Sequence, residues 1–176
     1  MKQITILFLY FLICKGNIAS AQSYNPPLPG EYLVNNTLDR FIGTWMWING
    51  NDTVKLFLKK ERIAAPGTLN FDYDAIIGWH LYKQGAVIVE SSFNYINTPY
   101  TDKHSTILGG NGRYGELGDT LKSFIRDVSK NKSISAKLII NTSRTQIQWE
   151  SSTSPGLHIN ENQGFTLPNS MILNKQ

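Results

Sequence analysis

Cysteine is nearly absent from this chain of 176 residues, and its single copy is Cys14. Because Cys14 lies in a segment that we expect to be removed, the mature chain would have no disulfide and no thiol nucleophile. Histidine is also rare, and its copies at His80, His104 and His158 lack the His-x-His or His-x-x-x-His spacing that places two ligands on one face. These absences predict no metal site and argue against cysteine catalysis.

Long apolar runs are missing except at the N-terminus. Lys2 precedes the apolar segment Ile4–Ile13, and Ala19-Ser20-Ala21 follows it. A basic start, a short apolar core and a small-x-small motif are the parts of a cleaved signal peptide, and this core is too short to span a bilayer. We therefore expect residues 1–21 to be a signal peptide, and the mature protein to be periplasmic or extracellular without a membrane span.

Cys14 offers an alternative, in which the protein is exported as a lipoprotein anchored through this cysteine. A lipoprotein peptidase needs a small residue directly before the cysteine, whereas the bulky Ile13 stands there. The sequence therefore favours cleavage after Ala21 over lipid anchoring.

A concentration of positive charge is also missing. The net charge is +4, and it falls to +2 when Lys2 and Lys15 leave with the signal peptide. Lys59-Lys60 is the one adjacent basic pair in the sequence. Because nucleic-acid-binding proteins gather Lys and Arg on one face, this scattered charge predicts no nucleic-acid partner.

Short segments with the period of a β-strand make up most of the mature chain. The clearest is 134–140, in which apolar residues alternate with others, and Asn49-Gly50 is a strong hairpin signal between two such segments. Segment 120–130 is the one stretch for which a helix is an alternative. We expect strands over 41–48, 53–60, 73–82, 86–91, 121–128, 134–140, 145–150 and 165–173.

About eight or nine short strands joined by turn residues predict an all-β fold, an antiparallel barrel, with a β-sandwich as the alternative. Residues 22–38 carry three prolines, Pro26, Pro27 and Pro29, without any periodicity. We therefore expect an extended lead-in over 22–38 and a single barrel domain over 39–176.

The segment Phe41-Ile42-Gly43-Thr44-Trp45 resembles the opening strand of lipocalin-like barrels. In those proteins the tryptophan of a Gly-x-Trp motif closes one end of the barrel, usually beneath an arginine from a late strand. The resemblance implies a lipocalin-like barrel closed by Gly43, Trp45 and Arg144, with a cation–π contact between the last two. The alternative is that Trp45 is an ordinary core aromatic.

Most of the mature chain resembles an uncharacterised family of small exported proteins from Bacteroidota-type bacteria. The resemblance is carried by Gly43-Thr44-Trp45, by 49–55 and by the C-terminal 165–175. It implies export and a domain of unknown function, and no particular activity. Two Asp-Thr-apolar sequences, at Thr53 and Thr120, are similar to the O-glycosylation sites of such bacteria, with ordinary strand-start residues as the alternative.

Each catalytic motif in the sequence lacks the context that its chemistry needs. The Gly-x-Gly-x-x-Gly of Gly110–Gly115 has no βαβ unit around it, and Asp72 and Asp74 lack the further oxygen ligands of a calcium site. No Gly-x-Ser-x-Gly is present. We therefore predict a non-catalytic protein without a cofactor. A hydrolase is the third hypothesis, and it needs His80, Asp72 or Glu150 to converge in a cleft.

Tryptophan supplies the candidate ligand site. Trp45 and Trp47 share one face of the first strand, and a small barrel is either filled by side chains or leaves room for one small ligand. We predict an interior site for a small apolar or amphipathic molecule, lined by Trp45, Trp47, Trp79 and Trp149. The alternative is an envelope or surface protein-interaction module with a filled core, which would use the loops 109–118 and 151–163.

Overall fold

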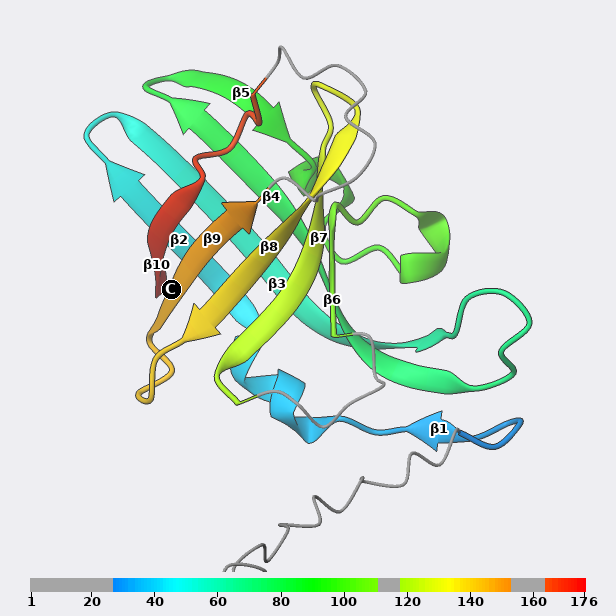
Figure 1. Ribbon diagram of the computed structural model, residues 1–176. Helices are drawn as coiled ribbons and strands as arrows, with labels where there is room; N and C mark the ends of the chain where they lie inside the picture. Colours follow the sequence, from blue (N-terminus) through cyan, green and yellow to red (C-terminus); the bar gives the residue numbers. More distant parts are fainter. Residues whose placement is uncertain (1–26, 111–117, 153–163) are drawn as a thin grey trace, which may run out of the picture.

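The computed structural model describes residues 27–110, 118–152 and 164–176, and these form a closed β-barrel (Figure 1). The predicted signal peptide, Cys14 and His158 lie outside the described residues, as do most of the Gly-x-Gly-x-x-Gly motif and most of the polar segment 151–163.

Eight strands form the wall of the barrel. Each strand pairs antiparallel with the next along the wall, and the last pairs with the first, which closes the ring. This is an up-and-down barrel, so the prediction of an all-β antiparallel barrel is confirmed over the sandwich. The wall strands are β2 (Gly43–Asn49), β3 (Asp52–Ala64), β4 (Asp72–Gln84), β6 (Ile107–Gly109), β7 (Thr120–Asp127), β8 (Lys132–Ile140), β9 (Gln146–Ser152) and β10 (Ser170–Lys175).

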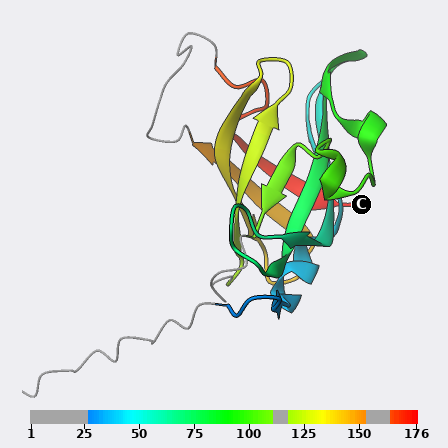
Figure 2. The ribbon, with the colours of Figure 1, turned by 90° about the vertical axis from the view of Figure 1, so that its right-hand side faces the viewer.

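Two further strands lie along β4. β1 (Tyr32–Leu33) pairs parallel with its start, and β5 (Val87–Ser91) pairs antiparallel with its end. The chain then leaves the wall as a loop over 92–106, which contains the short 3₁₀ helices η2 (Phe93–Tyr95) and η3 (Tyr100–Asp102), and it returns as β6. β5 and β6 therefore pair with the same edge of β4, β5 near its end and β6 in its middle. The loop stands outside the strands in Figure 2.

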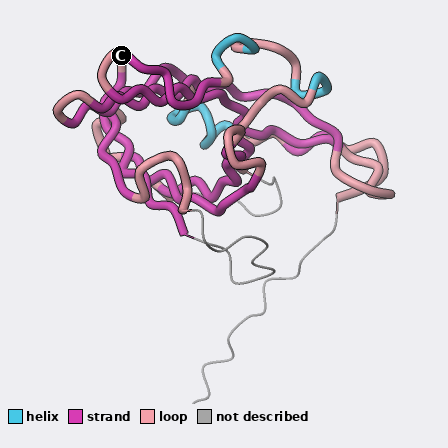
Figure 3. The backbone as a smooth tube through the Cα atoms, turned by 90° about the horizontal axis from the view of Figure 1, so that it is seen from above, coloured by secondary structure: helices cyan, strands magenta, loops and turns pink. Residues whose placement is uncertain are grey.

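The hairpin of β3 and β4 is longer than the rest of the wall. Both strands have 13 residues, and they stay paired from Asp52 and Gln84 to Ala64 and Asp72. Seen from above, the hairpin runs out beyond the ring of strands (Figure 3). Its far end therefore forms a wall outside the barrel, next to the loop over 92–106.

Side chains fill the interior of the barrel. Trp45, Trp149 and Phe41 are fully buried there, together with Leu38. Leu38 and Phe41 come from a third 3₁₀ helix, η1 (Asn36–Phe41). The stretch expected to be an extended lead-in thus includes β1 and supplies Leu38 to the core, and the boundary at residue 39 falls inside η1.

Candidate functional site: the outer groove

The four predicted tryptophans do not line one cavity. Trp45 and Trp149 are fully buried in the barrel core, and Trp47 is partly buried against the same core. Trp79 lies opposite Phe57 in the register, on the outer face of the wall, with their ring centroids 6.0 Å apart. Since neighbouring residues of a strand point to opposite faces, Trp79 is separated from the other three by the wall itself.

The closure of the barrel end at Trp45 differs from the expected one. The Trp45 indole N–H donates to the carbonyl oxygen of Phe41 at 2.8 Å, and the Lys175 ammonium lies 5.2 Å from the ring centroid. Gly43 has φ +132°, and an added Cβ would lie 3.2 Å from Lys175 Cε. The cation over Trp45 is therefore Lys175 of β10, while Arg144 is exposed in the turn between β8 and β9.

The acidic pair on β4 is divided between two partners. Asp72 pairs with Arg62 at 2.7 Å, whereas Asp74 is buried and accepts a hydrogen bond from the Tyr32 hydroxyl, with the Lys60 ammonium 3.7 Å away. Asp72 thus has Arg62 as its cation, whereas Asp74 shares Lys60 with Asp39, and each of the two carboxylates ties an N-terminal or hairpin segment to the wall. Among residues 27–110, 118–152 and 164–176, no three His, Cys, Asp or Glu side chains gather where they could hold a metal ion.

A buried polar network closes the wall where the loop over 92–106 leaves it. His80 Nε2 lies 2.7 Å from Glu90 Oε1, and His80 Nδ1 lies 2.8 Å from Thr106 Oγ1, which is 3.0 Å from Ser92 Oγ. Glu90 Oε1 also accepts from the backbone N–H of Val128 at 2.7 Å. These contacts join β4, β5 and the end of β7 across the gap that the loop leaves between the strands.

This network has the connectivity of a hydroxyl–imidazole–carboxylate triad, but it is closed to solvent. His80, Glu90 and Thr106 are at most 4% exposed. The residues expected to join His80 in a hydrolase are elsewhere: Asp72 pairs with Arg62, and Glu150 accepts from Gln148 at 2.8 Å on β9. The structure therefore does not bring His80 together with Asp72 or Glu150, as the hydrolase hypothesis needs.

Asp127 anchors the chain next to this network. It is fully buried, and its carboxylate accepts hydrogen bonds from Ser129 Oγ and from the backbone N–H groups of Lys130 and Thr166, at 2.8 to 2.9 Å. Burial alone raises the pKa of Asp127, but the hydrogen bonds from Thr166, Ser129 and Lys130 outweigh it, so the pKa lies below its ordinary value.

We expect Asp127→Asn to remove a pH-dependent part of the stability. A carboxyl whose pKa is lowered in the folded state stabilises the protein above its unfolded pKa of about 3.9, and this stabilisation is lost as the pH falls through the folded value. Urea unfolding at pH 7 should show a loss of about 1–3 kcal/mol for the variant. The difference from the wild type should shrink at pH 3, and an equal difference at both pH values would contradict this role.

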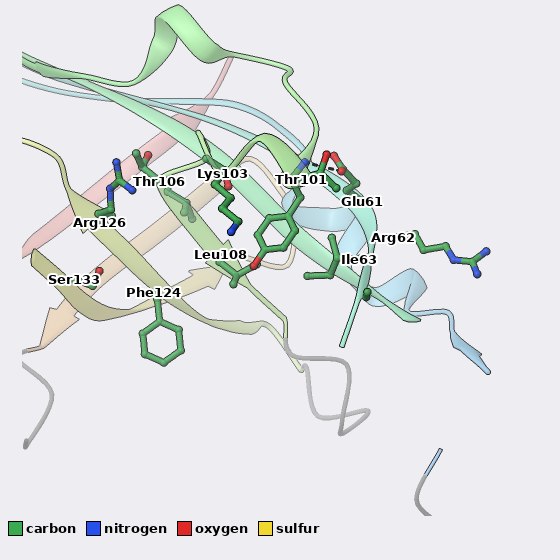
Figure 4. Close-up of a pocket in the computed structure, with 14 residues that line it drawn as sticks. Glu61, Arg62, Ile63, Thr101, Lys103, Thr106, Leu108, Phe124, Arg126 and Ser133 are labelled. Carbon is green, nitrogen blue, oxygen red and sulfur yellow. Dashed lines mark hydrogen bonds between the residues drawn. The ribbon is translucent and has the colours of Figure 1, made fainter. Parts of the chain in front are cut away.

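A groove of about 550 Å³ opens on the outer face of the barrel. It lies between the far end of β3, the loop around η3, and strands β6 and β7 (Figure 4). We call it the outer groove and define it by the residues that carry its chemistry: Ile63, Tyr100, Lys103, Leu108, Phe124 and Arg126.

Hydrogen bonds hold the loop side of the outer groove in place. Glu61 Oε1 on β3 accepts from the backbone N–H of Tyr100 at 2.8 Å, and Glu61 also pairs with Lys59 at 2.9 Å. Lys103 ends η3 in the left-handed conformation, with φ 57°, and its N–H donates to the carbonyl oxygen of Tyr100. On the opposite side, the N–H of Arg126 donates to the carbonyl oxygen of Thr106 at 2.8 Å. Hydrogen bonds from backbone N–H groups thus fix both sides of the outer groove.

The outer groove combines apolar surface with positive charge. Ile63 and Leu108 face it, and the Phe124 side chain is 61% exposed at its edge. Lys103 and Arg126 are exposed and form no ion pair with a described residue, and Figure 4 shows Lys103 directed into the groove. Such an arrangement suits a molecule with an apolar body and an anionic group.

Arg62, by contrast, contributes no available charge to the outer groove. Its guanidinium pairs with Asp72 at 2.7 Å and lies 4.4 Å from the ring centroid of Tyr32. Figure 4 shows it pointing away from the groove. The Glu61 carboxylate is likewise occupied by Lys59 and by the N–H of Tyr100, so the available charge of the groove is positive.

A family model described as a family of unknown function, DUF6705, matches residues 1–176. The chain belongs to this family. No curated protein and no solved structure matches the chain. The predicted resemblance to a family of unknown function is therefore confirmed. No helix among the described residues is long and apolar enough to cross a membrane.

The outer groove of this DUF6705 protein was not predicted as a site. One signal for it is present in the sequence: Phe124 stands on the polar face of its strand, between Lys122 and Arg126, where alternation calls for a polar residue. The two candidate glycosylation threonines, Thr53 and Thr120, are half-buried at the starts of β3 and β7, and their modification stays a prediction.

Proposed function

We propose that this DUF6705 protein is an exported, non-catalytic binding protein that holds a small amphipathic anion in the outer groove. The observation that carries the proposal is the presence of two cations without an ion-pair partner among the described residues, Lys103 and Arg126, beside the exposed ring of Phe124. A groove of this volume is within the usual range for small ligands. The filled barrel is then the scaffold, and the ligand lies outside it rather than among the tryptophans.

The charge of the ligand is the part of the proposal that can be tested most directly. We expect dodecanoate to displace the anionic dye 8-anilinonaphthalene-1-sulfonate from the protein, followed by dye fluorescence. Dodecylamine has the same apolar chain with the opposite charge, and we expect it to compete at least about tenfold less well, because like charges repel at the groove. Equal competition by both would contradict an anion site.

Two substitutions in the outer groove, Phe124→Ser and Arg126→Ala, test whether dodecanoate binds there. Each should weaken dodecanoate about tenfold or more, through lost apolar contact in the first variant and a lost charge-assisted hydrogen bond in the second. Ile172→Ser is the matched control, since Ile172 is 56% exposed on β10, outside the lining of the groove. A control variant that weakens binding as much as Phe124→Ser would place the ligand elsewhere.

Export rests on the N-terminal pattern of a basic start, a short apolar run and Ala19-Ser20-Ala21. The mass of the intact protein recovered from a producing bacterium should correspond to a chain that starts at Gln22. A mass that retains Met1, or one with a lipid on Cys14, would contradict this part of the proposal.

The second candidate is an envelope or surface protein-interaction module with a filled core. The packing of Trp45, Trp149 and Leu38 in the interior supports it, because this leaves the outer surface for contacts. The two candidates differ in what occupies the outer groove. An envelope protein that is captured by the wild type and lost with Phe124→Ser, together with no dye displacement by dodecanoate, would favour the second.

A further inference from the structure

A second recess, of about 500 Å³, lies on the same outer face and adjoins the outer groove. Leu108 and Phe124 line both, so the exposed Phe124 ring stands between them. The second recess is lined further by Tyr73 and by two lysines, Lys122 of β7 and Lys137 of β8.

The two lysines of the second recess oppose each other in the sheet. Lys122 and Lys137 are partners in the register of β7 and β8, and both are exposed. Side chains at such positions start about 4.5–5.5 Å apart, where like charges destabilise the sheet. Neither lysine forms an ion pair with a described residue. Glu150 is the partner of Lys137 on β9 and offsets part of this charge, although its carboxylate accepts from the neutral Gln148 amide and forms no ion pair with Lys137. An anion between the two ammonium groups would remove the repulsion.

The positive charges therefore form two separate groups along β7. Lys122, Phe124 and Arg126 are successive outward residues of this strand. At about 3.3 Å per residue, the Cα atoms of Lys122 and Arg126 lie roughly 13 Å apart. A ligand with a single anionic group cannot contact both ends, whereas an extended chain with repeated negative charges can.

We propose that the two recesses form one elongated site for an acidic oligosaccharide. Its negative groups would lie at Lys103 and Arg126 on one side and at Lys122 and Lys137 on the other, with a sugar ring on Phe124. This inference rests on the proposed function, since it extends the anion site of the outer groove into the second recess and gives the anion a sugar chain. Hydroxyl side chains that can bond to sugar hydroxyls line both recesses: Thr101, Ser105 and Ser133 in the first, and Ser152 in the second.

The aromatic content favours a sugar chain over single-stranded nucleic acid. Sites for single strands stack successive bases on several aromatic side chains. On this face, among the described residues, Phe124 is 61% exposed, Tyr100 is half-buried in the outer groove and Tyr73 is buried. One exposed ring among hydroxyls and separated cations fits a single sugar ring within a longer charged chain better than a row of stacked bases.

Calorimetric titration with galacturonate oligomers of two, four and eight units tests the inference. Because occupation of one recess raises the effective concentration of the chain at the other, we expect the octamer to bind at least about tenfold more tightly than the dimer. Maltooctaose, a neutral chain of the same length, should bind much more weakly. A heparin octasaccharide extends the test to sulfated chains, and failure of both acidic octamers to bind overturns the inference.

The double variant Lys122→Ala/Lys137→Ala separates this inference from the proposed function. It should reduce the affinity for the octamer to that for the dimer and leave dodecanoate in the outer groove unchanged. Lys55→Ala/Lys83→Ala removes the same charge from β3 and β4, outside both recesses, and should change neither.

Three further results would overturn the elongated site. The first is length-independent binding, and the second is an octamer affinity that the double variant leaves intact. The third is tighter binding of an eight-nucleotide oligothymidylate, or of vesicles with anionic phospholipid, than of the acidic octamers. If dodecanoate still binds in these cases, the proposed function stands without the extension. If dodecanoate does not bind either, the proposed function fails as well.

Discussion

Replacement of Gly78 by alanine is expected to destabilise the barrel by about 3 kcal/mol, at the upper end of what overpacking costs. Gly78 lies in β4, where it is the register partner of Leu58 on β3 and of Ile107 on β6. An added Cβ would lie 2.5 Å from Leu58 Cδ2 and 2.7 Å from the carbonyl oxygen of Phe57. The oxygen belongs to the sheet backbone, so it cannot move without strain on the pairing of β3 and β4.

Urea unfolding followed by tryptophan fluorescence measures this effect. Gly118→Ala is the matched control, because no atom of a described residue lies within 4 Å of the added Cβ and the backbone there does not have a positive φ. It should leave the free energy of unfolding within about 0.5 kcal/mol of the wild type. If Gly78→Ala had the same urea midpoint of unfolding as the wild type, the inference that β3 and β4 leave no room for a Cβ at this point would be wrong.

His80→Ala is expected to have an effect of similar size, about 3 kcal/mol or more. The substitution removes the imidazole that is hydrogen-bonded to the buried carboxylate of Glu90. Glu90 is 4% exposed, and the imidazole of His80 also holds the hydroxyl of Thr106. Since Thr106 lines the outer groove, the variant should also weaken binding of the anionic dye there. Urea unfolding gives the first effect, and dye titration of the folded variant gives the second.

His104→Ala is the control for this prediction. His104 is exposed and stacks on Tyr95 with ring centroids 4.0 Å apart, outside the wall of the barrel. Its loss should cost less than about 1 kcal/mol, which is the usual range for an exposed aromatic contact. Equal loss in the free energy of unfolding for the two histidine variants would show that the hydrogen bonds of His80 do not stabilise the closed wall.

Most strands could be predicted because alternation is a local property of the sequence. The bounds of β7 and β8 agree with the predicted segments within about two residues. For β7, the period of two correctly indicated a strand rather than a helix. β6 was missed because it has three residues and ends at Gly109, too short for any period to show. β3 runs to Ala64, beyond its predicted end, because pairing with β4 extends it.

The faces of β4 could not be predicted from the same pattern. Its residues from Tyr73 to His80 are all buried, since the barrel core covers one face and other segments cover the outer face. With apolar residues on both sides, nothing local distinguishes Trp79, which points outward, from Trp45, which points inward. For this reason the four tryptophans of the predicted ligand site do not share one cavity. A ligand cavity depends on which face of the wall is the interior.

The sequence by itself determined that this protein is a series of short antiparallel strands, because the period of two and the turn residues act within a few residues of each other. Only the closed tertiary structure decided that Lys175 covers Trp45, that Glu90 meets the backbone N–H of Val128 across the gap in the wall, and that Lys103 and Arg126 border one groove. Each of these contacts joins segments that strand pairing brings together in the closed barrel, and no local pattern encodes which of them will meet.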